Sequence, residues 1–151
     1  MKNPELSADS NYKSWLVAIK QTFQKTQLKA VVRVNATLLE FCWQLGSEIV
    51  EKQKNTNWGD GFLKQLSKDL SVEFIDVKGF SKRNLELIRK WFIFWNNASQ
   101  ITKQVVSQLN RIPWGHNIAI VTKSRSYEEA LYYVQSTIEQ GWSRSVLIHQ
   151  M

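Results

Sequence analysis

Positive charge gathers in the sequence directly after Ser81 and just ahead of a long apolar run. The residues that could do chemistry there are Lys82, Arg83, Asn84, Arg89 and Lys90. Serine is a favourable helix cap, because its hydroxyl can accept from a free N–H group of the first turn. Free N–H groups and cations at a helix start favour an anion such as phosphate. The spacing predicts a phosphate-binding helix start, and simple solvation of an exposed face is an equal alternative.

The charge of the whole chain points to the same segment. The net charge is +7, and residues 77–125 hold nine basic residues against one acid. Such a segment suits a polyanion, nucleic acid first and an anionic membrane surface second, with solubility alone as the third reading. The cations that we assign to the same surface outside the helix are Arg111, Lys123, Arg125 and Arg144.

Two patterns could instead indicate catalysis. Asp76 and Lys78 give the D-x-K spacing of metal-dependent nucleases, in which carboxylates hold a divalent ion. Arg111 and His116 give the R-x4-H spacing of some helical ribonucleases, but Pro113 between them argues against one continuous helix. His116 is then either a phosphate contact or a hydrogen-bonding group in a turn. With two histidines and one cysteine, we expect no protein-only transition-metal site, no cofactor and no catalytic residue.

Helical periodicity dominates the chain and places these residues. We expect a loose leader over 1–10 and a single helical domain over 11–151. The first helix is either continuous or broken near 24–27, and 101–109 is a weak helix or partly extended. Helices are predicted over about residues 11–52, 62–70, 82–96, 114–122, 127–140 and 144–151.

A seven-residue apolar rhythm runs from Leu28 to Ile49, with Asn35 as its polar member. A polar residue on such a seam can fix the register between helices, so a homodimer through this helix and packing within the chain are equal alternatives. Cys42 lies inside the same pattern and has no second cysteine to pair with. That composition, together with the absence of an apolar signal core, predicts a cytoplasmic protein.

Three separated motifs carry a resemblance. The chain resembles the N-terminal domain of the YhcG family of bacterial proteins in these motifs, which are GFSKRNLELIRKW at 79–91, IPWGHNIAI at 112–120 and IEQGWSRSVLIHQM at 138–151. The segment AVVRVNATLLEFCWQLGSEIV at 30–50 is similar to the same family. The resemblance implies a helical, winged-helix-like DNA-binding unit followed by a nuclease domain of the PD-(D/E)xK type. The recurring family positions here are Phe80, Ser81, Arg83, Asn84, Pro113, Trp114, Gly115, His116, Gly141, Trp142, Ser143 and Arg144.

We therefore expect an all-α protein, a helical bundle with a long N-terminal helix and a helix-turn-helix or winged-helix-like region. The expected function is binding of duplex DNA through a basic helical surface, without cleavage, because the chain stops at Met151. One alternative is a module that dimerises or docks a nuclease subunit, and another is a helical ribonuclease using Arg111 and His116. The predicted nucleic-acid-binding residues are Lys82, Arg83, Asn84, Arg89, Lys90, Arg111, His116, Lys123, Arg125 and Arg144.

Overall fold

The fold is all-helical in the computed structural model, which describes residues 6, 8–59, 61–97 and 103–151, with the backbone alone at 24–34 and 103. No strand occurs in these ranges, so the all-α prediction is confirmed. The wing that the family resemblance implies is not seen in this part of the chain. None of the helices described combines the length and apolar content that crossing a bilayer requires.

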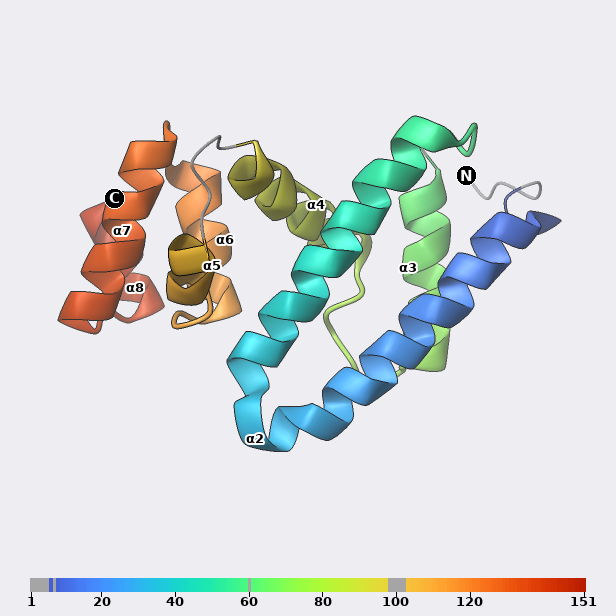
Figure 1. Cartoon of the computed structure of the whole chain (residues 1–151), viewed down its shortest axis with the longest axis horizontal. Coiled ribbons are helices and arrows are strands. Elements are labelled where there is room, and N and C mark those ends of the chain that lie inside the picture. The colour runs from blue at the N-terminus through green and yellow to red at the C-terminus, as the bar shows by residue number, and fades with distance from the viewer. Residues whose placement is uncertain (1–5, 7, 60, 98–102) are drawn as a thin grey trace.

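The longest element is α2, Ser10–Asn55, and it bends sharply into two arms that form a V (Figure 1). Asp9 caps it, because its Oδ1 accepts from the backbone N–H groups of Asn11 at 2.7 Å and Tyr12 at 3.1 Å. The two arms are tied together near the open end, where Nε1 of Trp15 donates to Glu48 at 2.7 Å. The backbone stays helical through the position where a break was the alternative, so the chain changes direction by bending.

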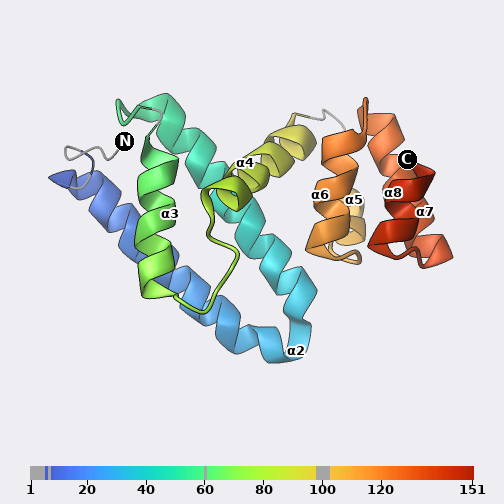
Figure 2. The same ribbon diagram turned by 180° about the vertical axis from the view of Figure 1, so that it is seen from behind.

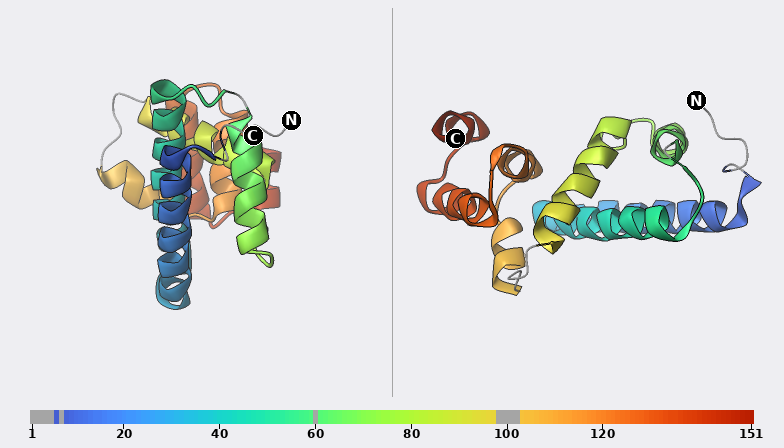
Figure 3. Two further views of the ribbon diagram at one scale, coloured as in Figure 1. Left: turned by 90° about the vertical axis from the view of Figure 1, so that its right-hand side faces the viewer. Right: turned by 90° about the horizontal axis from the view of Figure 1, so that it is seen from above.

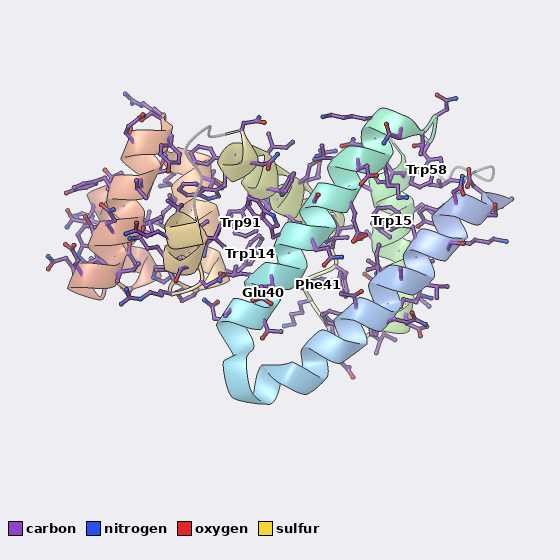
Figure 4. The ribbon with its side chains drawn as sticks, viewed as in Figure 1. Trp15, Glu40, Phe41, Trp58, Trp91 and Trp114 are labelled. Carbon is purple, nitrogen blue, oxygen red and sulfur yellow. The ribbon has the colours of Figure 1, made fainter. Side chains whose placement is uncertain are left out.

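Helix α3, Phe62–Glu73, lies behind the V in the view of Figure 1, to one side of the plane of its two arms (Figures 1 and 3). Trp15 and Trp58 stack at 5.8 Å, and Figure 4 shows them next to each other at this end of the fold. The hydroxyl of buried Tyr12 donates to Asp69 of α3 at 3.0 Å. Rings and one charged hydrogen bond therefore hold α3 to the first arm.

The helix after Ser81 lies at the centre of the fold. Helix α4, Lys82–Asn96, packs against α2 and α3 on one side and against α6 on the other. Trp91 and Trp95 are 2% and 0% exposed, as expected for core residues. At the crossing with α2 the backbones come very close, since a Cβ on Gly46 would lie 2.6 Å from the Cβ of Phe92.

The remaining helices form a second group at the far end of the molecule (Figures 1 and 3). They are α5 (Lys103–Leu109), α6 (Trp114–Lys123), α7 (Tyr127–Gln140) and α8 (Arg144–Gln150). The described part of the 101–109 segment is thus helical. Gly141 ends α7 in the left-handed region at φ 64°, and Ser143 caps α8, which confirms the helix, corner and helix outline. Seen from above, α4 spans the space between the two groups (Figure 3).

The predicted leader is partly attached to the fold. Leu6 is 1% exposed, and Asp9 caps α2, whereas residues 1–5 and 7 lie outside the described part of the chain. Whether residues 11–151 behave as one domain in solution stays a prediction.

The apolar residues of the seven-residue pattern in α2 pack within the chain wherever their side chains are described. Leu39, Cys42, Leu45 and Ile49 are all at most 3% exposed. Asn35 donates to two carbonyl oxygens of the loop before α6, so its partners are intramolecular. Leu38 is half-buried, and the side chains of Leu28 and Val31 lie outside the described part of the chain, so a homodimer through this helix stays a prediction.

Candidate nucleic-acid interface

The first turn of α4 presents Lys82 and Arg83 to solvent. The Oγ of Ser81 accepts from the backbone N–H of Asn84 at 3.1 Å, which confirms the predicted cap. Phe80, directly before the cap, is 2% exposed and fixes the entry of the chain into the helix. The two cations therefore leave the core at a defined place.

The carboxamide of Asn84 is engaged within the chain. Its Nδ2 donates to the carbonyl oxygen of Gly79 at 2.6 Å, and its Oδ1 accepts from Nε1 of Trp114 at 3.2 Å. An amide that already uses a donor and its acceptor has less capacity left for a base edge. In this structure Asn84 joins the first turn of α4 to the first turn of α6.

The first turn of α6 is also fastened to the start of α8. Nε2 of His116 lies 2.9 Å from the carbonyl oxygen of Trp142, so that nitrogen must carry the proton and donate. The Cδ of Arg144 lies 3.2 Å from where a Cβ on Gly115 would be, so Arg144 crosses α6 at a residue without a side chain. Of its two predicted roles, His116 here fills the structural one.

Two asparagines hold the loop between α5 and α6. Asn117, 1% exposed, donates to three carbonyl oxygens between residues 109 and 113 at 3.0 to 3.3 Å, and accepts from Nε1 of Trp91 at 3.2 Å. Asn35 of α2 donates to two carbonyl oxygens of the same loop at 2.9 and 2.7 Å. Sequence reasoning missed Asn117, whose only signal was a polar residue inside the apolar stretch IPWGHNIAI.

These bonds bring the first turns of three helices to one side of the molecule, where α4, α6 and α8 lie in front of α2, α5 and α7 (Figure 2). We name as the basic edge the four exposed cations at or next to these turns. They are Lys82, Arg83, Arg111 and Arg144. None of the four has an ion-pair partner among the described residues. The ion pair that does occur in these residues joins Lys20 to Glu73 at 3.8 Å. Helix N-termini add partial positive charge to such an edge.

A second basic feature lies along the outward face of α4. It is a groove of about 520 Å³, which we name the α4–α6 groove. Its lining residues are Arg83, Glu86, Leu87, Arg89, Lys90, Ile93, Phe94 and Thr122. Arg89 and Lys90 thus lie with Arg83, as the sequence predicted, but beside apolar side chains that it did not place there.

Lys123 and Arg125 are exposed but belong to the other end of α6. A helix of this length rises about 1.5 Å per residue, so Lys123 lies more than 10 Å along its axis from Trp114. Thr122 lines the α4–α6 groove and directly precedes Lys123, so the two cations belong to that end of α6 and not to the basic edge. The predicted set is therefore divided between two regions of the surface.

The groups considered for catalysis lie in the loop before α4 and around the start of α6. Asp76 and Lys78 are exposed in the loop before α4, and no cluster of possible metal ligands occurs among the described residues. Arg111 precedes α6 and His116 lies inside it, where its Nε2 is bonded to a carbonyl oxygen. Burial raises the pKa of the Cys42 thiol to about 12, so this residue supplies no thiolate at neutral pH.

The sequence model described as the DUF1016 N-terminal domain matches residues 18–151, which include every residue of the basic edge and of the groove. No curated protein and no solved structure matches the chain.

Proposed function

The chain belongs to the family of DUF1016 N-terminal domains, the N-terminal domains of YhcG proteins, and on that premise we propose that it binds duplex DNA. In this proposal it is the targeting part of a YhcG-type nuclease system and contacts the phosphate backbone through the basic edge. Cleavage is not assigned to it.

The observation that carries the proposal is the set of unpaired cations at three linked helix starts. Lys82, Arg83, Arg111 and Arg144 are exposed and free of ion pairs within the described residues. Phosphate contacts by lysine and arginine release condensed counterions and supply sequence-independent affinity. Hydrogen bonds from Trp114 and His116 fix the spacing of these helix starts, so the cations are held on a rigid frame.

The other predicted residues take different parts in this proposal. Asn84 and His116 are positioning residues, because their polar atoms are bonded within the chain. Lys123 and Arg125 lie at the far end of α6, where a longer duplex could reach them. Backbone contacts position a protein on DNA without reading its sequence, so we expect weak sequence preference.

The test is the salt dependence of binding to a mixed-sequence duplex, measured by fluorescence anisotropy. Four phosphate contacts predict a log–log slope of about −3.6, which amounts to a roughly 150-fold loss of affinity between 50 and 200 mM salt. The variant with all four residues of the basic edge changed to glutamine should lose most of the affinity and of the slope.

A matched control removes the same charge elsewhere. Its four substitutions fall on exposed lysines outside the proposed surface, and they are Lys13→Gln, Lys54→Gln, Lys64→Gln and Lys68→Gln. We expect this control to keep most of its affinity, because local contacts outweigh net charge. Equal losses in the two variants, or no binding by the native chain at 50 mM salt, would refute the proposal.

A further inference from the structure

Two large apolar side chains protrude from the end of α3. Val72 is 71% exposed and Ile75 is 83% exposed, the highest exposures among the large hydrophobic residues described. Glu73 and Asp76 alternate with them and are also exposed. We name residues 72–76 the acidic protrusion. Apolar side chains grouped in this way mark an interaction site more often than a random surface does.

The acidic protrusion is held in place from below. The ring of Phe74 packs on Phe23 at 5.0 Å and on Phe80 at 5.9 Å. The N–H of Phe74 donates to the carbonyl oxygen of Leu70 at 2.9 Å, and the N–H of Val77 donates to that of Phe74 at 3.0 Å. Because its central residue is anchored, the protrusion presents Val72 and Ile75 without an entropy cost for ordering a loop.

The α4–α6 groove has the opposite character. Arg83, Arg89 and Lys90 outnumber its single carboxylate, Glu86. Its apolar lining consists of Leu87, Ile93 and Phe94, and Ile93 is 38% exposed. A phosphate backbone would contact only the cations of the groove. An acidic segment with apolar side chains would contact both the cations and the apolar lining.

We propose that the acidic protrusion of one copy of this chain docks in the α4–α6 groove of a second copy. Val72 and Ile75 would cover Leu87, Ile93 and Phe94, and Glu73 and Asp76 would face the three cations. Glu73 is ion-paired with Lys20 at 3.8 Å, and because its side chain is 47% exposed it can also reach a cation of the second copy. Within one chain both surfaces are exposed and do not cover each other, so the proposed contact is between two copies.

The proposed contact joins two different surfaces, so it is heterologous. Each copy carries one protrusion and one groove. Two reciprocal contacts would close a two-fold pair, whereas a single contact leaves one protrusion and one groove free to bind further copies. A small interface of this kind is expected to be weak, with association visible only at high protein concentration. This inference goes beyond DNA binding and does not depend on it.

The test is sedimentation velocity without DNA, from about 10 to 500 µM protein, since weak interfaces dissociate in that range. The native chain should associate with rising concentration. Ile75→Asp, which removes the most exposed apolar side chain of the protrusion, and Lys90→Glu, which reverses the charge of one groove cation, should each weaken association at least tenfold. Both positions are exposed, and circular dichroism checks that each variant folds.

Mixing the two variants gives the sharpest result. Ile75→Asp keeps an intact groove and Lys90→Glu keeps an intact protrusion, so an equimolar mixture should form one-to-one pairs that neither variant forms alone. Val146→Asp is the matched control, because this exposed valine of α8 belongs to neither surface, and it should associate like the native chain.

Three outcomes would overturn the proposal: a native chain that stays monomeric at the highest concentration, an Ile75→Asp variant that associates as the native chain does, or a mixture that remains monomeric. DNA binding that persists in Ile75→Asp while association is lost would show that the two proposals stand separately. If Lys90→Glu loses DNA binding and the native chain never associates, the groove serves the nucleic acid and the proposed contact is refuted.

Discussion

Replacing Gly46 by alanine should destabilise the fold, although alanine is the better helix former. In the interior of α2, Gly46→Ala gains about 1 kcal/mol of helix propensity. The new Cβ, however, would lie 2.6 Å from the Cβ of Phe92 and 3.1 Å from the carbonyl oxygen of Ile88. Carbon atoms in contact prefer separations of about 3.5–4.0 Å, so α2 and α4 would have to move apart by about 1 Å.

Overpacking of this kind costs about 1–3 kcal/mol and occasionally more. After the gain in helix propensity is subtracted, Gly46→Ala should therefore destabilise the fold by up to about 2 kcal/mol. For a domain of this size, a change of 1 kcal/mol moves Tm by about 2–4 °C, which gives a fall of up to about 8 °C. Thermal unfolding followed by far-UV circular dichroism measures the change.

Gly115→Ala is the matched control. It also places alanine in a helix, but the nearest atom to its Cβ is Cδ of Arg144 at 3.2 Å, on a flexible and exposed side chain. We expect its Tm to equal or exceed that of the native chain. A Gly46→Ala variant as stable as the native chain would show that the close approach of α2 and α4 does not limit their packing.

Three further predictions follow from buried groups. Asn117→Ala should lower the free energy of unfolding in urea by about 2–4 kcal/mol, because Nε1 of Trp91 and the loop carbonyl oxygens lose their partner. A loss under about 1 kcal/mol would mean that these atoms form hydrogen bonds with water instead. Burial, and then the negative charge of Asp69, raise the pKa of Tyr12. Above pH 10 only the unfolded state ionises this tyrosine, so the free energy of unfolding should fall there by about 1.4 kcal/mol per pH unit. Tyr12→Phe should remove that part of the slope. Cys42 should react with a thiol reagent at pH 8 only as fast as the chain opens, and immediate reaction would contradict its burial.

The sequence was sufficient where the determinants are local. Ser81, Ser126 and Ser143 all cap the helices they precede, because a cap needs only a hydroxyl and the N–H group three residues on. Gly141 ends α7 with a positive φ that a side chain would disfavour. The central place of α4 also followed from the sequence, since two adjoining apolar faces require partners on two sides.

The sequence was insufficient where partners are distant in the chain. Nothing near Asn84 indicates that Trp114, thirty residues on, will occupy its amide. In the same way, the carbonyl oxygen of Trp142 uses the Nε2 of His116. Residues 71–78 are a connection by sequence, either extended or a last helical turn, and only the tertiary fold shows that Val72 and Ile75 are exposed there. The candidate cations could be named from the sequence. Their division between the basic edge and the α4–α6 groove could not be predicted from it.

The tryptophans of this chain form optical reporters in both halves of the fold. Trp15 and Trp58 stack at 5.8 Å between α2 and α3, while Trp91 and Trp114 meet edge to face at 5.1 Å where α4 joins α6 (Figure 4). Rings held this rigidly give near-ultraviolet dichroism, and that signal vanishes when their packing loosens even if the helices persist. The unmodified protein can therefore report, without a dye, whether its two ends lose their packing together or one after the other.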